Sequence, residues 1–346
     1  MAKGIGSMDV RKLQLTGGVT YTLSLPKFWV ETNKLESSDG IQVDWRPSGA
    51  LRLTPVKDVN EMRRRSIVIQ EDIPDAAIFD HLVGSYLSGA DQIDFISRKV
   101  IGRNSKLVIR EFLRTTRGFE ISSETDKKII LVSLLSASEM PLRVSINRMY
   151  QQLTSLIRDI GDVMIGGDYE LIEDHEEREQ EIDSIRLLVE RQVSSLLDSY
   201  KVAEALNLGR REAVEFANLS RSLERMADHA NQLSELIIST EKIPNMNPDD
   251  APLSLIPIWQ DAMRSLMLNL RTDDAEKIEI ARSNLKQSKN KLLDYEEKLW
   301  SQKESPSRIL FKFKFSESIR RICSYSRDFG EIILNMMAHS NVIEDN

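Results

Sequence analysis

Residues 215–237 constrain the fold more than any other stretch of this chain. Apolar side chains recur there at steps of three and four, which places them on one seam of an amphipathic helix: Phe216, Leu219, Leu223, Met226, Ala230, Leu233 and Ile237. Glu224 and Asp228 are four residues apart, so they stack on one flank of that helix. A carboxylate pair beside a core seam either faces solvent or holds a metal ion, and the two alternatives imply different functions.

The rest of the C-terminal region is also predicted to be helical. We expect six helices, separated by polar breaks or by breaks that contain Gly and Pro, at about 139–166, 168–200, 210–239, 252–271, 273–302 and 308–340. Long helices joined by short loops are typical of up-and-down bundles. The low aromatic content of 6% and the abundance of helix formers also favour a mainly α fold.

The seam of residues 215–237 recurs near the end of the chain. The aligned pairs are Leu219 with Phe315, Leu223 with Ile319, Met226 with Ile322, Leu233 with Phe329 and Ile237 with Ile333. The flank differs, because the repeat has Arg320, Ser324 and Tyr325 where the first copy has Glu224, Asp228 and His229. We therefore predict two tandem three-helix bundles, at 139–240 and 250–346, with one carboxylate site of this kind at most.

The preceding helix contributes a second acidic pair. Glu179 and Asp183 are four residues apart, along the edge of a core stripe formed by Ile182, Ile185, Val189, Val193 and Leu196. Antiparallel packing of the two helices would bring these carboxylates close to Glu224 and Asp228. Four oxygen donors suit a hard divalent cation such as Mg²⁺, Ca²⁺ or Mn²⁺, or iron, and His175 and His229 would add nitrogen ligands. The alternative is two solvated helix faces, since acidic pairs at this spacing are common.

Residues 8–56 have the pattern of short strands. Leu13 and Leu15 alternate with polar residues before the Gly17-Gly18 turn, and the alternation resumes from Val19. Pro26 opens a short helix, and two further strands follow from about 41 and 51. A ~50-residue unit of this kind buries little core alone, and pairing with a second copy would remedy that.

Residues 8–65 carry ten Lys or Arg against seven Asp or Glu and are therefore basic, whereas the whole chain has a formal net charge of −7. The candidate DNA contacts are Arg11, Lys12, Lys27, Arg46 and Arg52. The alternative is a dimerisation module with dispersed charge. Between this region and the helices, residues 57–138 are predicted to form an α/β connecting module of order β-α-β-α-β-β, with no metal, phosphate or nucleophile signature.

The sequence contains no motif that indicates an enzyme. Its four histidines are scattered, and no Ser-His-Asp arrangement or phosphate-binding Gly-rich loop is present. The single cysteine, Cys323, forms no intrachain disulfide, so we expect a cytoplasmic protein. No apolar run is long enough for membrane insertion, and no signal-peptide core is found at the N-terminus.

The segment LSRSLERMADHANQLSEL resembles the signature helix of the PhoU family of phosphate-uptake regulators. The matching residues are Arg221, Glu224-Arg225 and Asp228-His229-Ala230, and EDHEEREQEID resembles the family's second acidic helix. The resemblance covers about 139–346 and implies two tandem three-helix repeats and a regulator that is not an enzyme. It also implies surface metal bound by acidic motifs, here Glu179, Asp183, Glu224 and Asp228. Arg320 and Ser324 depart from the motif in the second repeat.

Residues 8–56 resemble the AbrB/MazE/SpoVT swapped-hairpin family, through a strand, a Leu-Pro helix, an Asp-Gly turn and two further strands. Members form intertwined dimers, and many bind DNA. The whole arrangement resembles archaeal PhoU-like regulators. It implies a homodimeric, phosphate-responsive transcription regulator of phosphate uptake. The helical body would sense phosphate through a metal or through a partner, such as the phosphate transporter's ATPase or another signalling protein. The alternative is an adaptor that docks on the transporter or a signalling partner without binding DNA.

Overall fold

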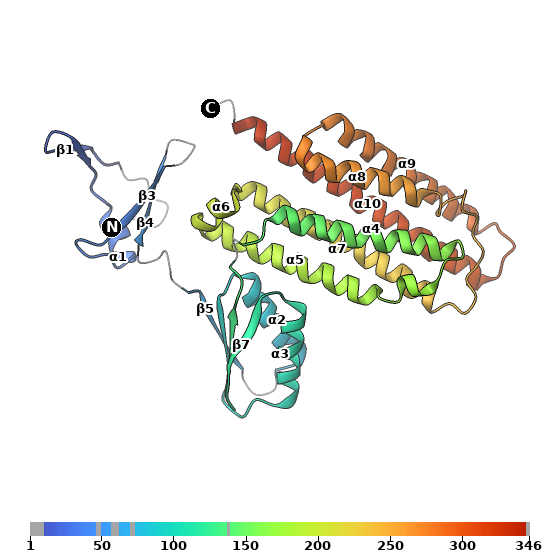
Figure 1. Ribbon diagram of the computed structural model, residues 1–346, viewed down its shortest axis with the longest axis horizontal. Helices are drawn as coiled ribbons and strands as arrows, with labels where there is room; N and C mark the ends of the chain where they lie inside the picture. The colour runs from blue at the N-terminus through green and yellow to red at the C-terminus, as the bar shows by residue number, and fades with distance from the viewer. Residues whose placement is uncertain (1–9, 46–49, 57–61, 70–72, 137–138, 344–346) are drawn as a thin grey trace. The chain divides into compact units, whose positions relative to one another are not determined.

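The computed structural model describes residues 10–45, 50–56, 62–69, 73–136 and 139–343 (Figure 1). Contacts divide the chain into two compact units, residues 1–63 and 64–346. The expected mainly α chain with a small β-rich N-terminal region is confirmed. The finer domain boundaries, at 8–56, 57–138, 139–240 and 250–346, stay predictions.

The first unit consists of two hairpins and one short helix. Strands β1 (Gln14–Thr16) and β2 (Thr20–Thr22) pair antiparallel across Gly17 and Gly18, whose φ angles of +64° and +82° suit residues without a Cβ. Helix α1 (Lys27–Thr32) follows Pro26, and β3 (Ile41–Trp45) pairs antiparallel with β4 (Leu51–Pro55). Each hairpin is a separate two-stranded sheet, so neither has a sheet neighbour within the described part of this chain.

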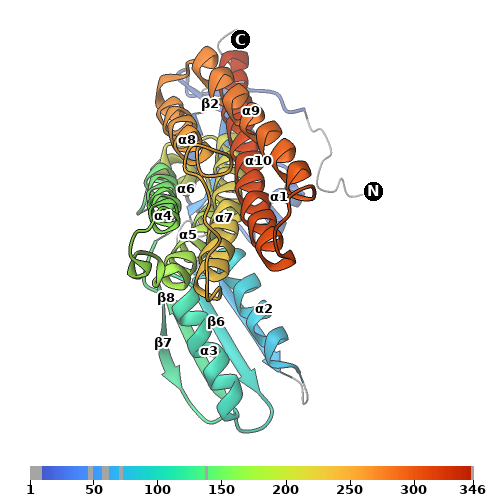
Figure 2. The same cartoon turned by 90° about the vertical axis from the view of Figure 1, so that its right-hand side faces the viewer.

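The second unit begins with an α/β module. Its elements are β5 (Arg64–Ile69), α2 (Asp75–Leu87), β6 (Gln92–Ser97), α3 (Arg103–Thr115), β7 (Phe119–Glu124) and β8 (Lys128–Ser133), in the order expected from the sequence. The sheet order is β5-β6-β8-β7, with β5 parallel to β6 and the other pairs antiparallel. Helices α2 and α3 run side by side along the module (Figure 2). Its buried core includes Leu187 of the helical body, so the module packs directly on that body.

The helical body contains six long helices in the described residues. They are α4 (Leu142–Met164), α5 (His175–Asp198), α7 (Arg210–Ile238), α8 (Leu255–Thr272), α9 (Ala275–Leu299) and α10 (Pro306–Ile343). The seven seam residues predicted on α7 are all buried in one core that extends through both sets of three helices. Spacing along the sequence therefore predicted correctly which face of α7 is buried.

The segment expected as one helix over 168–200 differs from that prediction. Residues Tyr169–Ile172 form a 3-10 turn (η2), and α5 begins only at His175. The Asp168 side chain accepts a hydrogen bond from the Glu170 backbone N–H at 3.1 Å, which holds the chain in the tighter turn. The short helix α6 (Tyr200–Leu206), which the sequence pattern does not predict, follows α5 after a break at Ser199.

Helices α7 and α10 pack against each other with opposite directions (Figure 1). The start of α7 and the end of α10 line one pocket, and His229 stacks on Tyr325 near the middle of both helices, with 5.8 Å between ring centroids. His229 and Tyr325 occupy the same position in the two sequence copies. This contact between equivalent residues indicates that the two sets of helices face each other about an approximate two-fold axis.

Candidate functional site

Helices α5 and α7 bring the four predicted metal ligands into one half-buried group. On α5 the stripe from Ile182 to Leu196 is buried, which leaves Glu179 and Asp183 on its flank. The Arg186 side chain reaches both Asp183 on its own helix, at 2.6 Å, and Glu224 on α7, at 3.5 Å. We call Glu179, Asp183, Glu224 and Asp228 the α5/α7 acidic cluster.

The carboxylates of this cluster repel one another in a partly desolvated environment. Burial, followed by the charge of Asp228, raises the pKa of Glu224 to about 7. Burial also raises the pKa of Glu179, with added repulsion from Asp183 and Asp228. Burial is likewise the main cause that raises the pKa of Asp228. Each of these three carboxyl groups is therefore harder to ionise in the folded protein than in water.

An arginine that the sequence reasoning missed lies among these carboxylates. The Arg186 guanidinium pairs with Asp183, with Glu224 and, at 3.2 Å, with Glu190, while Arg221 of α7 pairs with Glu190 at 2.7 Å. The signal within α5 was visible, since Arg186 is three residues after Asp183 and four before Glu190, which puts all three on one face. The contact between Arg186 and Glu224 depends on how α5 and α7 are shifted along each other, so no pattern within α5 predicts it.

The two histidines considered as extra ligands are engaged elsewhere. The Nδ1 atom of His175 is hydrogen-bonded to the Asn231 side chain, and His229 stacks on Tyr325. Within the described residues, no three acidic, histidine or cysteine side chains gather closely enough to hold a metal ion. As arranged, the cluster does not fit a metal ion, because a guanidinium joins two of its four carboxylates. Binding of a divalent metal or iron stays a prediction.

The predicted DNA-contacting residues lie on different elements of the first unit. Arg11 and Lys12 precede β1 and are exposed. Lys27 begins α1 and is 3.5 Å from Glu31, with both side chains exposed. Arg52 lies on β4 opposite Asp44 of β3, and Arg46 lies outside the described residues. Contact of these residues with DNA stays a prediction.

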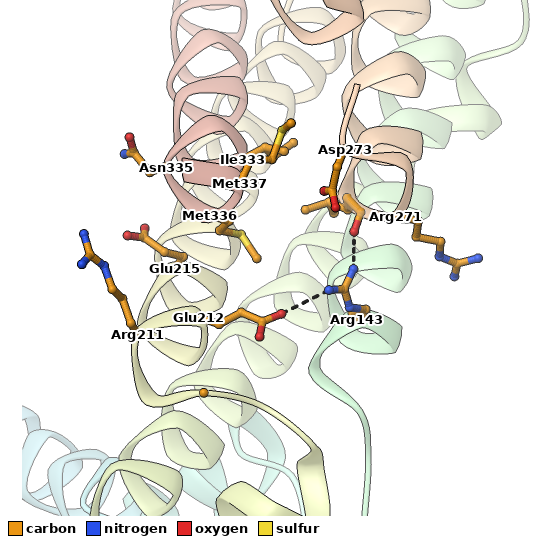
Figure 3. A pocket seen from close by; sticks show the side chains of 12 residues that line it. Arg143, Arg211, Glu212, Glu215, Arg271, Asp273, Ile333, Asn335, Met336 and Met337 are labelled. Carbon is orange, nitrogen blue, oxygen red and sulfur yellow. Dashed lines mark hydrogen bonds and ion pairs between the residues drawn. The ribbon is translucent and has the colours of Figure 1, made fainter. Parts of the chain in front are cut away.

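A pocket of about 610 Å³ lies where α4, α7, α8 and α10 meet, and the sequence reasoning did not foresee it (Figure 3). Arg143 of α4 donates hydrogen bonds to the Leu270 carbonyl and, at 3.1 Å, to Glu212 of α7. The charged side chains of the lining are balanced, with Arg143, Arg211 and Arg271 against Glu212, Glu215 and Asp273. The formal charges of these side chains sum to zero, so the lining by itself does not indicate the charge of a ligand.

The fold and the cluster define a class of protein: a helical body of two packed three-helix sets, with acidic pairs on adjacent helices of the first set. A family model described as the PhoU domain matches residues 146–237, which run from α4 to the end of α7. This match supports a PhoU-like protein and suggests a regulator of phosphate homeostasis. No match to a curated protein is found. None of the helices in the described ranges is long and apolar enough to cross a membrane.

Proposed function

We propose that this chain is a cytoplasmic, phosphate-responsive regulator of phosphate uptake that binds DNA as a homodimer and has no enzymatic activity. The observation that carries the proposal is the PhoU domain match over α4–α7, in a chain that also has an N-terminal unit of two separate hairpins, described over residues 10–45 and 50–56. The hairpin unit binds operator DNA. The helical body responds to phosphate status through a partner, such as the phosphate transporter's ATPase or another signalling protein.

The hairpins supply the argument for a dimer. Leu15 and Tyr21 are partners across β1 and β2, and their side chains are 58% and 70% exposed. Leu13, Leu23, Val43 and Leu51 are at least half exposed as well. Apolar side chains on a two-stranded sheet need another surface to pack against, because an isolated hairpin is marginally stable in water. A second copy of the unit supplies that surface, with the same residues contributing from each chain.

The dimer can be tested by changing the exposed hairpin face. Replacing Leu15 and Tyr21 with Asp puts charges where the second copy is expected to pack, so light scattering should show monomers in place of dimers. The matched control is the pair Leu268→Asp and Val144→Asp on α8 and α4, which are also exposed and should leave the dimer intact. A dimer that persists with both hairpin substitutions would place the dimer contact elsewhere.

DNA binding can be tested through its salt dependence. The full-length dimer is titrated onto fluorescent duplexes from the promoters of phosphate-transport genes at several salt concentrations. Each phosphate neutralised adds about 0.9 to the slope of log affinity against log salt. Replacing Arg11 and Lys12 with Ala removes two cations per chain, so the slope should flatten by about 3 to 4 per dimer.

A control pair separates specific contacts from overall charge. Replacing Arg210 and Arg211 at the start of α7 with Ala changes net charge equally but lies outside the hairpin unit, so the slope should stay that of the parent. Equal slopes for the parent and the Arg11/Lys12 variant would show that these residues are not the contacts. Absence of binding to all duplexes would favour the second candidate, an adaptor whose hairpins only dimerise and whose body docks on the transporter or a signalling protein.

A further inference from the structure

Arg186 is the central cation of the α5/α7 acidic cluster. Its side chain is only 19% exposed and pairs with Asp183, Glu190 and Glu224 at 2.6, 3.2 and 3.5 Å. A guanidinium stays protonated at any pH of interest and presents several donors in a rigid plane. It can therefore join carboxylates of two helices, which is the role a bound metal would have in the same cluster.

The second set of helices holds a related pair with the charges exchanged. Arg320 of α10 is the counterpart of Glu224 in the sequence repeat, and its Nε lies 2.9 and 3.1 Å from the two carboxylate oxygens of Glu296 on α9. Glu296 is 6% exposed and also accepts a hydrogen bond from Ser316 at 3.0 Å. An arginine–carboxylate pair thus joins α5 to α7 in the first set and α9 to α10 in the second. The arginine is on α5 in the first set and on α10 in the second.

We propose that Arg186 is a built-in counter-ion that takes the place of a metal ion in the α5/α7 acidic cluster, so that a metal binds there only when Arg186 is removed or displaced. This inference does not depend on the proposed role in phosphate uptake. A metal that ligates Asp183 and Glu224 must first break their pairs with the guanidinium. Arg186 is on α5, three residues after Asp183, so its guanidinium competes with a metal ion at a high effective concentration.

The pattern of charge supports this assignment. The cluster has four carboxylates, and Arg186 pairs with Asp183 on α5 and with Glu224 on α7. Arg221 also joins the two helices, but it does so through Glu190, which lies beside the cluster. Removing Arg186 leaves the acidic side chains half-buried without that compensation, which costs free energy unless another cation enters. The carboxylates are oxygen donors, so the replacement is expected to be a hard divalent ion.

The test compares Mn²⁺ binding to the full-length parent and to the Arg186→Gln variant, both freed of metal by chelation, using calorimetry and thermal unfolding. We expect the variant to bind Mn²⁺ at least about tenfold more tightly than the parent, a difference equal to about 1.4 kcal/mol. Adding Asp183→Asn and Glu224→Gln to the variant should abolish the gain. The matched control is Arg148→Gln, which removes an arginine that pairs with Glu181 of α5 outside the cluster, and should behave as the parent.

Two results would overturn the proposal. One is that the parent binds Mn²⁺ as tightly as the Arg186→Gln variant does and loses this binding when Glu224→Gln is introduced into the parent. The other is a folded Arg186→Gln protein that gains no binding. If the Gln variant does not fold, Arg186→Lys replaces it, because lysine keeps the charge but loses the planar fork. This second variant should show a measurable gain in Mn²⁺ affinity over the parent, and no gain would count against the counter-ion role.

Discussion

Arg191 attaches the α/β module to the helical body, and its removal should loosen that attachment. The side chain is 3% exposed on α5 and donates a hydrogen bond to the Tyr86 carbonyl at 2.9 Å. Its guanidinium carbon lies 5.0 Å from the centre of the Tyr86 ring and 5.1 Å from that of Phe119. The Asp91 carboxylate lies 3.8 Å from the Arg191 guanidinium. Arg191 thus contacts α2, the α2–β6 loop and β7 from one position on α5.

The expected cost of Arg191→Ala follows from these contacts. A hydrogen bond from a charged group contributes about 1.5–3 kcal/mol, and a desolvated cation–π contact contributes about 2 kcal/mol at most. The cost is reduced because the variant no longer buries a charge. The Tyr86 carbonyl also keeps a donor, since the Gly89 backbone N–H reaches it at 3.0 Å. We therefore expect a net loss of about 3 kcal/mol.

Native-state hydrogen exchange can measure this loss locally. The amides of β6 and β8, in the middle of the module's sheet, should exchange about two orders of magnitude faster in the variant, because 1.4 kcal/mol corresponds to a factor of ten. The amides of α7 and α10 should be unchanged. Arg110→Ala, on the exposed face of α3, is the matched control and should shift exchange by less than about 0.5 kcal/mol. A change of less than threefold in β6 and β8 would refute the role assigned to Arg191.

Three further predictions concern the helical body. Leu223→Ala removes a fully buried seam side chain and should lower the free energy of unfolding by about 3–5 kcal/mol in urea titrations, whereas Val214→Ala, at an exposed position of α7, should have little effect. The pKa of Glu224 is raised from 4.5 to about 7 in the folded protein, which means that the folded state holds this proton more tightly than the unfolded state. With a chelator present to remove metal, the free energy of unfolding should therefore fall as pH rises from about 4.5 to 7. The Glu224→Gln variant has no carboxyl group to ionise, so it should be more stable than the parent by up to about 3 kcal/mol above pH 7 and no more stable at pH 4. Equal pH profiles of stability for the two proteins would contradict the raised pKa of Glu224. Glu296→Ala takes the buried carboxylate from the partly buried Arg320, which keeps only the more distant Glu317 at 3.9 Å, and should destabilise by about 3 kcal/mol. The double variant Glu296→Leu with Arg320→Met should lose much less in urea titrations, and a double variant as unstable as the single one would contradict this account.

Local sequence patterns predicted several features of the structure correctly. The spacing of apolar residues on α7 predicted its buried face, and the Gly17-Gly18 pair predicted the turn between β1 and β2. Both follow from interactions between residues a few positions apart. The acidic pairs on α5 and α7 were also visible as surface flanks, and the structure brings them close together.

The tertiary structure alone decided which side chains meet across elements. The pairing of Arg186 with Glu224, the contact of Arg191 with the α/β module and the pocket at Arg143 all depend on how far one helix is shifted along another. A heptad pattern leaves that shift undetermined, because moving a helix by seven residues restores the same apolar seam. The sequence therefore determined the helices and their buried faces. The register set by side-chain packing determined that the acidic cluster contains an arginine.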